Sequence, residues 1–192
     1  KLIPKLNEIK ESFEKADVIF KNLRTADIID GINKGEIDFG IIRKSAVTSN
    51  LTSLPLGALK FAFFYPSHSK IDPSDEAQLF SSFPLAIMEG EGRYQKFISE
   101  LPSKHAILVR KSVSCSSFPM MAKTLTSIPV AAILPTIASE GLPAESFKMA
   151  ELASLKPLAQ ELCVCWNQRL ASMNPTLKEL GKALAKLTRK ED

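Results

Sequence analysis

Several short polar segments carry the side chains of this chain that could bind a small molecule. The first, Arg43-Lys44-Ser45-Ala46, follows an apolar run with the pattern of a buried strand. Residues after such a strand lie at its carboxyl end, where open parallel sheets bind ligands. Arg43 could hold an anion through two parallel hydrogen bonds, or it could be an ordinary solvated charge, and the sequence leaves both open. Ser45 is a candidate through its position more than its chemistry.

The second segment, Glu89–Arg93, lies between an apolar run and a helical pattern. Its glycines let backbone amides approach a ligand, and a helix start favours negative charge. It is not a dinucleotide-binding loop, because it lacks the spacing of three glycines and carries glutamates that would repel phosphates. A simple turn followed by a first helical turn fits the same residues.

The third segment, Ser114-Cys115-Ser116-Ser117, precedes another helical pattern, so hydroxyls and free amides converge there. Helix capping is the simpler interpretation of Ser117. Thr136 follows a proline that closes an apolar run, and both a ligand contact and a plain turn are compatible with it.

Catalytic and metal-binding patterns are absent from the sequence. His68 and His105 lie far apart without cysteine or carboxylate partners at ligand spacing, and neither a G-x-S-x-G elbow nor a P-loop occurs. We therefore expect no enzyme, no metal and no cofactor. Cys163 and Cys165 share one face of a strand pattern without the geometry for a bridge, so we expect reduced thiols and a structural role for Cys115.

The elements that must position these segments alternate between helix and strand. In Ala26–Arg43, Ile28, Ile29 and Ile32 share a helical face, Gly35 suits a left-handed cap, and an apolar strand follows. We expect helices at 2–15, 26–34, 93–101, 118–128 and from 174 onward, and strands at 18–20, 37–43, 58–65, 85–88, 105–109, 130–134 and 158–166. This alternation indicates an α/β protein built on parallel strands.

The composition fits a globular protein, with 45% hydrophobic residues and a net charge of +4. The lysines are dispersed, which is weak support for nucleic-acid contact by this chain. No apolar run approaches the roughly 20 residues of a membrane helix, and the first residues lack a signal peptide's pattern. We expect a cytoplasmic fragment or processed piece that does not enter the membrane.

Five strings, in order, resemble the effector-binding domain of LysR-type transcriptional regulators. They are KLIPKLNEIKESF, DIIDGINKGEIDFGII, LTSLPLGALKFAFFYPSHS, FPLAIMEGEGRYQKF and PVAAILP. The resemblance covers nearly the whole chain. It implies a two-lobed α/β fold of the type 2 periplasmic-binding-protein-like kind, with residues 1–66 and 155–192 in lobe I, residues 67–154 inserted as lobe II, and a central cleft.

The resemblance also implies a function. A small anionic or polar effector would bind between the lobes and change how subunits pack in a homodimer or tetramer. DNA would be bound only through an N-terminal winged helix-turn-helix, which nothing in this chain resembles. The effector-binding candidates are Arg43, Ser45, Glu89, Arg93, Ser114, Ser116 and Thr136.

Two other functions remain as alternatives. A solute-binding protein of a transporter shares the bilobal plan, and would need an export signal or lipid anchor in the complete gene. An enzyme on the same fold would need a catalytic base, nucleophile or cofactor loop, none of which the sequence offers.

Overall fold

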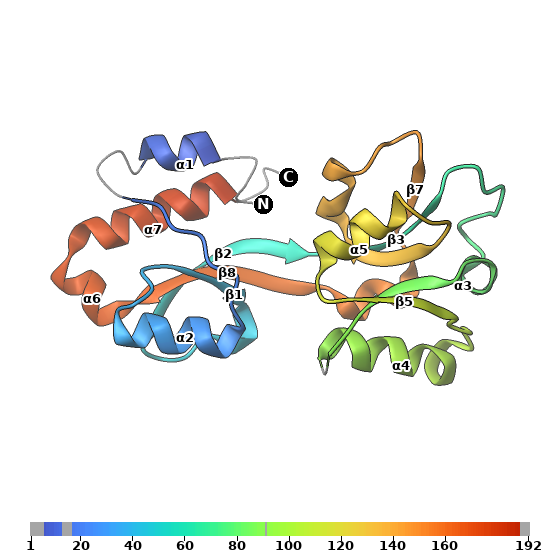
Figure 1. Cartoon of the computed structure of the whole chain (residues 1–192). Helices are drawn as coiled ribbons and strands as arrows, with labels where there is room; N and C mark the ends of the chain where they lie inside the picture. Colours follow the sequence, from blue (N-terminus) through green and yellow to red (C-terminus); the bar gives the residue numbers. More distant parts are fainter. Residues whose placement is uncertain (1–5, 13–16, 91, 189–192) are drawn as a thin grey trace. The chain divides into compact units, whose positions relative to one another are not determined.

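The computed structural model describes residues 6–12, 17–90 and 92–188. The chain forms two compact units, one of residues 1–58 with 160–192 (unit 1) and one of residues 59–159 (unit 2). Each unit has its own sheet and its own helices (Figure 1).

Unit 1 holds a three-stranded sheet in the order β1-β8-β2. The strands are β1 (Gly40–Arg43), β8 (Gln160–Asn167) and β2 (Leu51–Leu59), and the helices are α1 (Leu6–Ser12), α2 (Thr25–Lys34), η2 (Lys44–Ala46), α6 (Gln168–Met173) and α7 (Pro175–Thr188). β1 runs antiparallel to β8, with Gly40 opposite Cys165. The long strand β8 therefore fixes the position of β1.

The turn from α2 into β1 forms as the sequence predicts. Gly35 adopts φ 76°, and its N–H group bonds to the carbonyls of Gly31 and Ile32, which closes the helix. The apolar face of α2 packs on the sheet, where Ile32 is fully buried with Ile42 and Cys165. This packing places the end of β1 and the residues after it.

The other face of the unit 1 sheet packs against α7 around Trp166. The indole of Trp166 is buried and packs edge-on against the Phe39 ring, with 6.2 Å between the ring centroids. A Cβ atom added at Gly181 of α7 would lie 2.7 Å from the indole, so the helix approaches Trp166 closely because this position lacks a side chain. Trp166 is the core anchor that the sequence predicts.

Unit 2 holds a five-stranded sheet in the order β5-β4-β6-β3-β7. Its strands are β3 (Phe61–Pro66), β4 (Leu85–Met88), β5 (Lys111–Cys115), β6 (Ala131–Pro135) and β7 (Phe147–Ala150), and its helices are α3 (Glu76–Ser82), α4 (Arg93–His105), α5 (Phe118–Leu125), η3 (Thr136–Gly141) and η4 (Ala153–Leu158). β4 is parallel to both β5 and β6, whereas β3 is antiparallel to β6 and β7. The parallel part of the sheet is therefore the β5-β4-β6 side.

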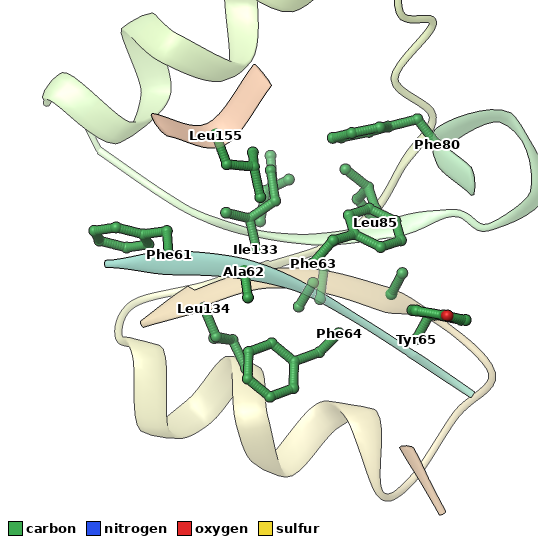
Figure 2. Close-up of a cluster of buried hydrophobic side chains, with 14 of the residues drawn as sticks. Phe61, Ala62, Phe63, Phe64, Tyr65, Phe80, Leu85, Ile133, Leu134 and Leu155 are labelled. Atoms are coloured by element: carbon green, nitrogen blue, oxygen red, sulfur yellow. The ribbon is translucent and has the colours of Figure 1, made fainter. Parts of the chain in front are cut away.

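The core of unit 2 fills both faces of this sheet. Figure 2 shows Phe64 and Leu134 pointing to one side, while Phe80 and Leu155 lie on the other. Phe63 and Phe80 place their ring centroids 4.7 Å apart. Because β3 and β6 are buried on both faces, they carry the near-continuous apolar runs FAFFY and AAILP.

The α/β fold class is confirmed, but several local predictions are wrong. Residues 18–20 form no strand, because they pair with no described neighbour. The strand predicted over 105–109 is absent as well, since α4 runs to His105 and ends at Ala106 (φ 54°), and the next strand starts at Lys111. The sheet of unit 2 is mixed, and β1 of unit 1 is antiparallel to β8, so the protein is not built on parallel strands alone. The helix predicted over 2–15 is described only at Leu6–Ser12, and its remaining residues lie outside the described part.

Candidate functional site

Three parallel strands of unit 2 end at one edge of its sheet. Met88 pairs with Cys115, and the N–H group of Glu89 donates to the Cys115 carbonyl at 2.8 Å. β6 runs parallel to β4 on its other side, with Ala86 opposite Ala132. Three candidates, Glu89, Ser116 and Thr136, therefore follow neighbouring strands at the same edge. Residues at the carboxyl ends of parallel strands are expected to meet in this way.

The loop after β4 delivers the start of α4 to this edge. Gly90 has φ 103°, a backbone conformation that favours glycine, and Gly92 is the cap residue. Glycine has no side chain that could cap the first N–H groups of the 13-residue helix. Such groups attract anions.

A second helix starts beside it. Ser117 caps α5 by accepting a hydrogen bond from the N–H group of Met120 at 3.4 Å, which confirms its capping interpretation. The hydroxyl of Ser116 is exposed and contacts the Met120 sulfur at 3.6 Å. Ser114 lies within β5 opposite Ile87, and its side chain is also exposed. These two hydroxyls are thus accessible to a ligand, while that of Ser117 is engaged.

Arg93 makes a hydrogen bond within unit 2. Its guanidinium donates to the carbonyl of Pro157 in η4, although the residue as a whole is exposed. A guanidinium has five N–H donors, so this bond leaves others for a ligand. Arg93 therefore combines a structural contact with a place at the first turn of α4.

Thr136 also makes backbone contacts. Its N–H group donates to the Lys60 carbonyl at 3.0 Å, and its own carbonyl accepts from the Ser139 hydroxyl at 2.9 Å. The residue opens η3 and is half-buried. Its backbone thus fits the turn interpretation.

Two polar side chains that sequence reasoning missed fix α4 in position. The Tyr94 hydroxyl donates to the Ile133 carbonyl at 3.3 Å, and the Gln95 amide donates to the Met88 carbonyl. Burial raises the pKa of Tyr94, so its phenol stays protonated and able to donate. In the sequence, the only sign of this role is that Tyr94 and Gln95 are polar residues on the inner face of a helix that follows a strand.

Arg43 and Ser45 belong to unit 1. Arg43 is the last residue of β1 and is half-buried, and Ser45 lies exposed in η2. Two candidates therefore lie at the end of β1, and the other five lie at the edge of unit 2.

The described part of the chain shows neither a group of metal-ligating side chains nor a helix that could span a membrane. Within residues 6–12, 17–90 and 92–188, no three His, Cys, Asp or Glu side chains are grouped to hold a metal ion. None of the helices in these ranges has the length and apolar character to cross a membrane. All three cysteines are free and buried.

Comparison with known families matches the chain over residues 1–188 to the LysR substrate binding domain. No curated protein sequence matches it.

Solved structures share its fold at low sequence identity. The regulatory domain of MexT, a transcriptional activator in Pseudomonas aeruginosa, is 15% identical, with a TM-score of 0.74 over 97% of this chain and 92% of that one. HinK, a LysR family transcriptional regulator from the same organism, is 14% identical, with a TM-score of 0.69 over 100% of this chain. Full-length OxyR C199D from P. aeruginosa is 17% identical, with a TM-score of 0.72 over 98% of this chain. The chain spans about two thirds of the longer regulators, 66% of HinK and 64% of OxyR.

Proposed function

The chain belongs to the LysR substrate-binding domain family, the non-enzymatic effector-binding domains of LysR-type transcription regulators, and on this premise we propose that it senses a small anionic or polar metabolite. In this proposal the metabolite binds between the two predicted lobes, residues 1–66 with 155–192 and residues 67–154.

The observation that carries the proposal is the shared edge of β4, β5 and β6 in unit 2. Two helix starts, those of α4 and α5, open there beside the exposed hydroxyls of Ser114 and Ser116. Unpaired amides at a helix start and neutral hydroxyls together suit a carboxylate or phosphate group. Glu89 at the same edge would accept a hydrogen bond from a hydroxyl or ammonium group of the same ligand.

Each candidate has a role in this proposal. Arg43 pairs with the anionic group and Ser45 adds a hydroxyl from the other lobe. Arg93 donates through the N–H groups that Pro157 does not use, and Thr136 contributes its hydroxyl. Ser114, Ser116 and Glu89 supply the polar contacts described above.

Sensing follows from differential affinity. A ligand that binds one arrangement of the lobes more tightly shifts the population toward it, and by no more than that difference in affinity. We propose that this shift changes subunit packing in a cytoplasmic homodimer or tetramer and so controls DNA binding by an N-terminal winged helix-turn-helix.

A titration with a panel of metabolites tests the proposal. Carboxylates, phosphates, amino acids and neutral sugars are titrated by calorimetry into the chain, with sedimentation measured in parallel. We expect one anionic or polar class to bind and to alter sedimentation. Failure of every class to bind, together with sedimentation as a fixed monomer, would refute it.

The doubly substituted variant Ser114→Ala/Ser116→Ala tests whether the ligand binds at these two hydroxyls. It should weaken affinity for the binding class, while Ser172→Ala, an exposed serine on α6 of unit 1, should bind as the parent does. Equal losses in the two variants would mean that the ligand binds elsewhere.

A further inference from the structure

A cavity of about 640 Å³ lies wholly within unit 1, where three segments of the chain meet. The end of α2 supplies Asn33 and Lys34, Asn50 lies directly before β2, and the turn from β8 into α6 supplies residues 167–170. Pockets for small molecules have volumes of about 300–1,000 Å³. This cavity therefore has the size of a ligand site.

The cavity is separate from the effector-binding candidates. Arg43 lies opposite Leu162 and marks one end of the β1–β8 pair. Asn167 lies at the other end, beyond the pair of Gly40 with Cys165, and the stretch of strand from Leu162 to Asn167 spans about 17 Å. None of the seven candidates is among the described residues that line the cavity.

Hydrogen bonds between the three segments hold the cavity in shape. The Asn50 side-chain amide donates to the Asn33 side-chain carbonyl at 2.5 Å, which joins the start of β2 to α2. The N–H group of Gln168 donates to the Asn50 backbone carbonyl at 3.2 Å. The Asn167 side-chain amide donates to the Ile32 backbone carbonyl at 3.4 Å. Because these bonds already order the walls, a ligand has little of the protein left to order when it binds.

The side-chain oxygens of the three asparagines are already engaged. Asn33 accepts from Asn50, and Asn50 accepts from the Thr48 hydroxyl at 2.6 Å. Asn167 accepts from two N–H groups at the start of α6, at 2.9 and 3.1 Å. The protein thus occupies these three acceptors itself, and what the asparagines can still offer a ligand is N–H donors.

The remaining groups are mainly donors, and they carry positive charge. The Arg169 guanidinium and the NH₂ group of Asn33 make no hydrogen bond to a described residue, and both residues are exposed. The Lys34 ammonium group donates to Asp30 at 2.7 Å and has further N–H donors. No aspartate or glutamate is among the described residues that line the cavity. Arginine and amide donors without a lining carboxylate suit an oxyanion, and phosphate offers more acceptor oxygens than a carboxylate does.

We propose that this cavity binds the phosphate group of a small metabolite. Arg169 supplies two parallel N–H donors, and Asn33 and Lys34 supply further ones. The cavity is larger than a phosphate ion, so the organic part of the ligand lies beside Gln168 and Leu170. A ligand held between α2 and α6 stabilises unit 1 by mass action. This inference goes beyond the sensing function, because it uses none of the effector-binding candidates.

Nuclear magnetic resonance of the isotope-labelled protein tests the proposal residue by residue. Inorganic phosphate, glycerol phosphate and acetate are titrated separately at constant ionic strength, which keeps the screening of surface charges equal. We expect saturable shifts of the backbone amides of 33–35 and 167–170 with both phosphate compounds. Glycerol phosphate should bind more tightly than inorganic phosphate, and acetate should not saturate.

Three results would overturn the inference. The first is the lack of a saturable shift in these two segments with either phosphate compound, including shifts confined to unit 2. The second is an affinity for acetate equal to that for glycerol phosphate, which would exclude selection of a phosphate group. The third is binding of inorganic phosphate at least as tight as that of glycerol phosphate, because the free ion would then be the ligand.

A matched pair of arginine variants separates the site from overall charge. Arg169→Ala removes the guanidinium from the cavity and should weaken the binding of glycerol phosphate by about tenfold or more. Arg24→Ala, at an exposed arginine of unit 1 that does not line the cavity, should bind as the parent does. Equal losses in the two variants would show that only net charge matters, and would contradict a site at Arg169.

A further variant changes the cavity without removing its internal bonds. Asn33→Asp keeps an oxygen that accepts from Asn50, but replaces the NH₂ group with a second carboxylate oxygen. The phosphate group then meets a like charge, so we expect the saturable shifts to disappear. The melting temperature of the ligand-free protein should change little, because the residue is exposed. Parent-like binding of glycerol phosphate by Asn33→Asp would count against a phosphate group at this place.

Discussion

The carboxylate of Glu76, on α3, accepts a hydrogen bond from the backbone N–H group of Ala153 at 2.6 Å, across 77 residues of sequence. It also accepts from the N–H group of Ser154 at 3.2 Å. The Arg93 guanidinium bonds to the Pro157 carbonyl in the same short helix η4. Two side chains from different helices thus hold η4, directly before the chain enters β8.

Removal of the Glu76 carboxylate should destabilise the protein. Glu76→Ala leaves the N–H group of Ser154, a residue only 4% exposed, without its acceptor, and a hydrogen bond to a charged group contributes about 1.5–3 kcal/mol. We expect the free energy of unfolding to fall by about that amount in urea denaturation. Glu76→Gln keeps an acceptor oxygen and should lose less. Glu140→Ala, at an exposed glutamate of the same unit, should change stability little, and an equal loss there would contradict this explanation.

Arg43→Ala should weaken binding of the effector found in the calorimetric panel. Loss of a charge-assisted hydrogen bond costs about 1.5–3 kcal/mol, which corresponds to a decrease in affinity of roughly ten- to a hundredfold. Arg24→Ala, at an exposed arginine directly before α2, serves as the control for overall charge. Similar affinities in both variants would remove Arg43 from the site.

The buried thiols predict a decline in stability at alkaline pH. Burial raises the pKa of Cys165 from 9.0 to about 12, and it also raises the pKa of Cys163. Above pH 9 the unfolded chain loses these protons while the folded chain keeps them, so the folded state binds more protons and stability falls as pH rises from 9 toward 12. Urea denaturation of the parent and of Cys165→Ala across this range should show a shallower fall in the variant. Parallel curves would contradict the assignment.

Alkylation offers a second measurement on the same thiols. The thiolate is the reactive form, so the folded protein at pH 8 should react with a maleimide far more slowly than the unfolded chain. Mass spectrometry of the modified peptide that contains Cys163 and Cys165 measures this rate. Fast labelling of the folded protein would show that β8 opens readily.

Gly181→Ala should destabilise unit 1 although alanine is the better helix former by about 1 kcal/mol. The added methyl group would lie 2.7 Å from the ring of Trp166, which is buried and cannot move away easily. Overpacking of this kind costs about 1–3 kcal/mol, so we expect a net loss in urea denaturation followed by circular dichroism. Lys182→Ala on the same helix breaks only an exposed ion pair with Glu179 and should cost less than about 0.5 kcal/mol. A stabilised Gly181→Ala protein would mean that α7 can shift away from the sheet.

Local patterns predicted the elements whose signals are complete within a short stretch. The helix over 26–34, its glycine cap and the strand that follows need only periodicity and one left-handed residue, and the structure has all three. The short helices α3 and α6 were missed, because seven and six residues are too few to show a helical period.

Elements that depend on distant partners could not be predicted in the same way. Residues 18–20 have the composition of a strand, but a strand exists only when a neighbour pairs with it. The contact of Arg93 with Pro157 joins positions 64 apart, so no local pattern reveals it. The grouping of Glu89, Ser116 and Thr136 at one edge was predictable from strand ends alone, and the binding roles of all seven site candidates stay predictions.

Trp166, on β8 with its indole against α7, gives the protein a built-in optical probe. It is the single tryptophan of the chain and lies in unit 1, whereas both tyrosines, Tyr65 and Tyr94, lie in unit 2. Indole emission excited at the red edge reports on one half of the molecule, and phenol absorption reports on the other. A loss of the two signals at different urea concentrations would reveal that the halves melt separately, without any label attached to the protein.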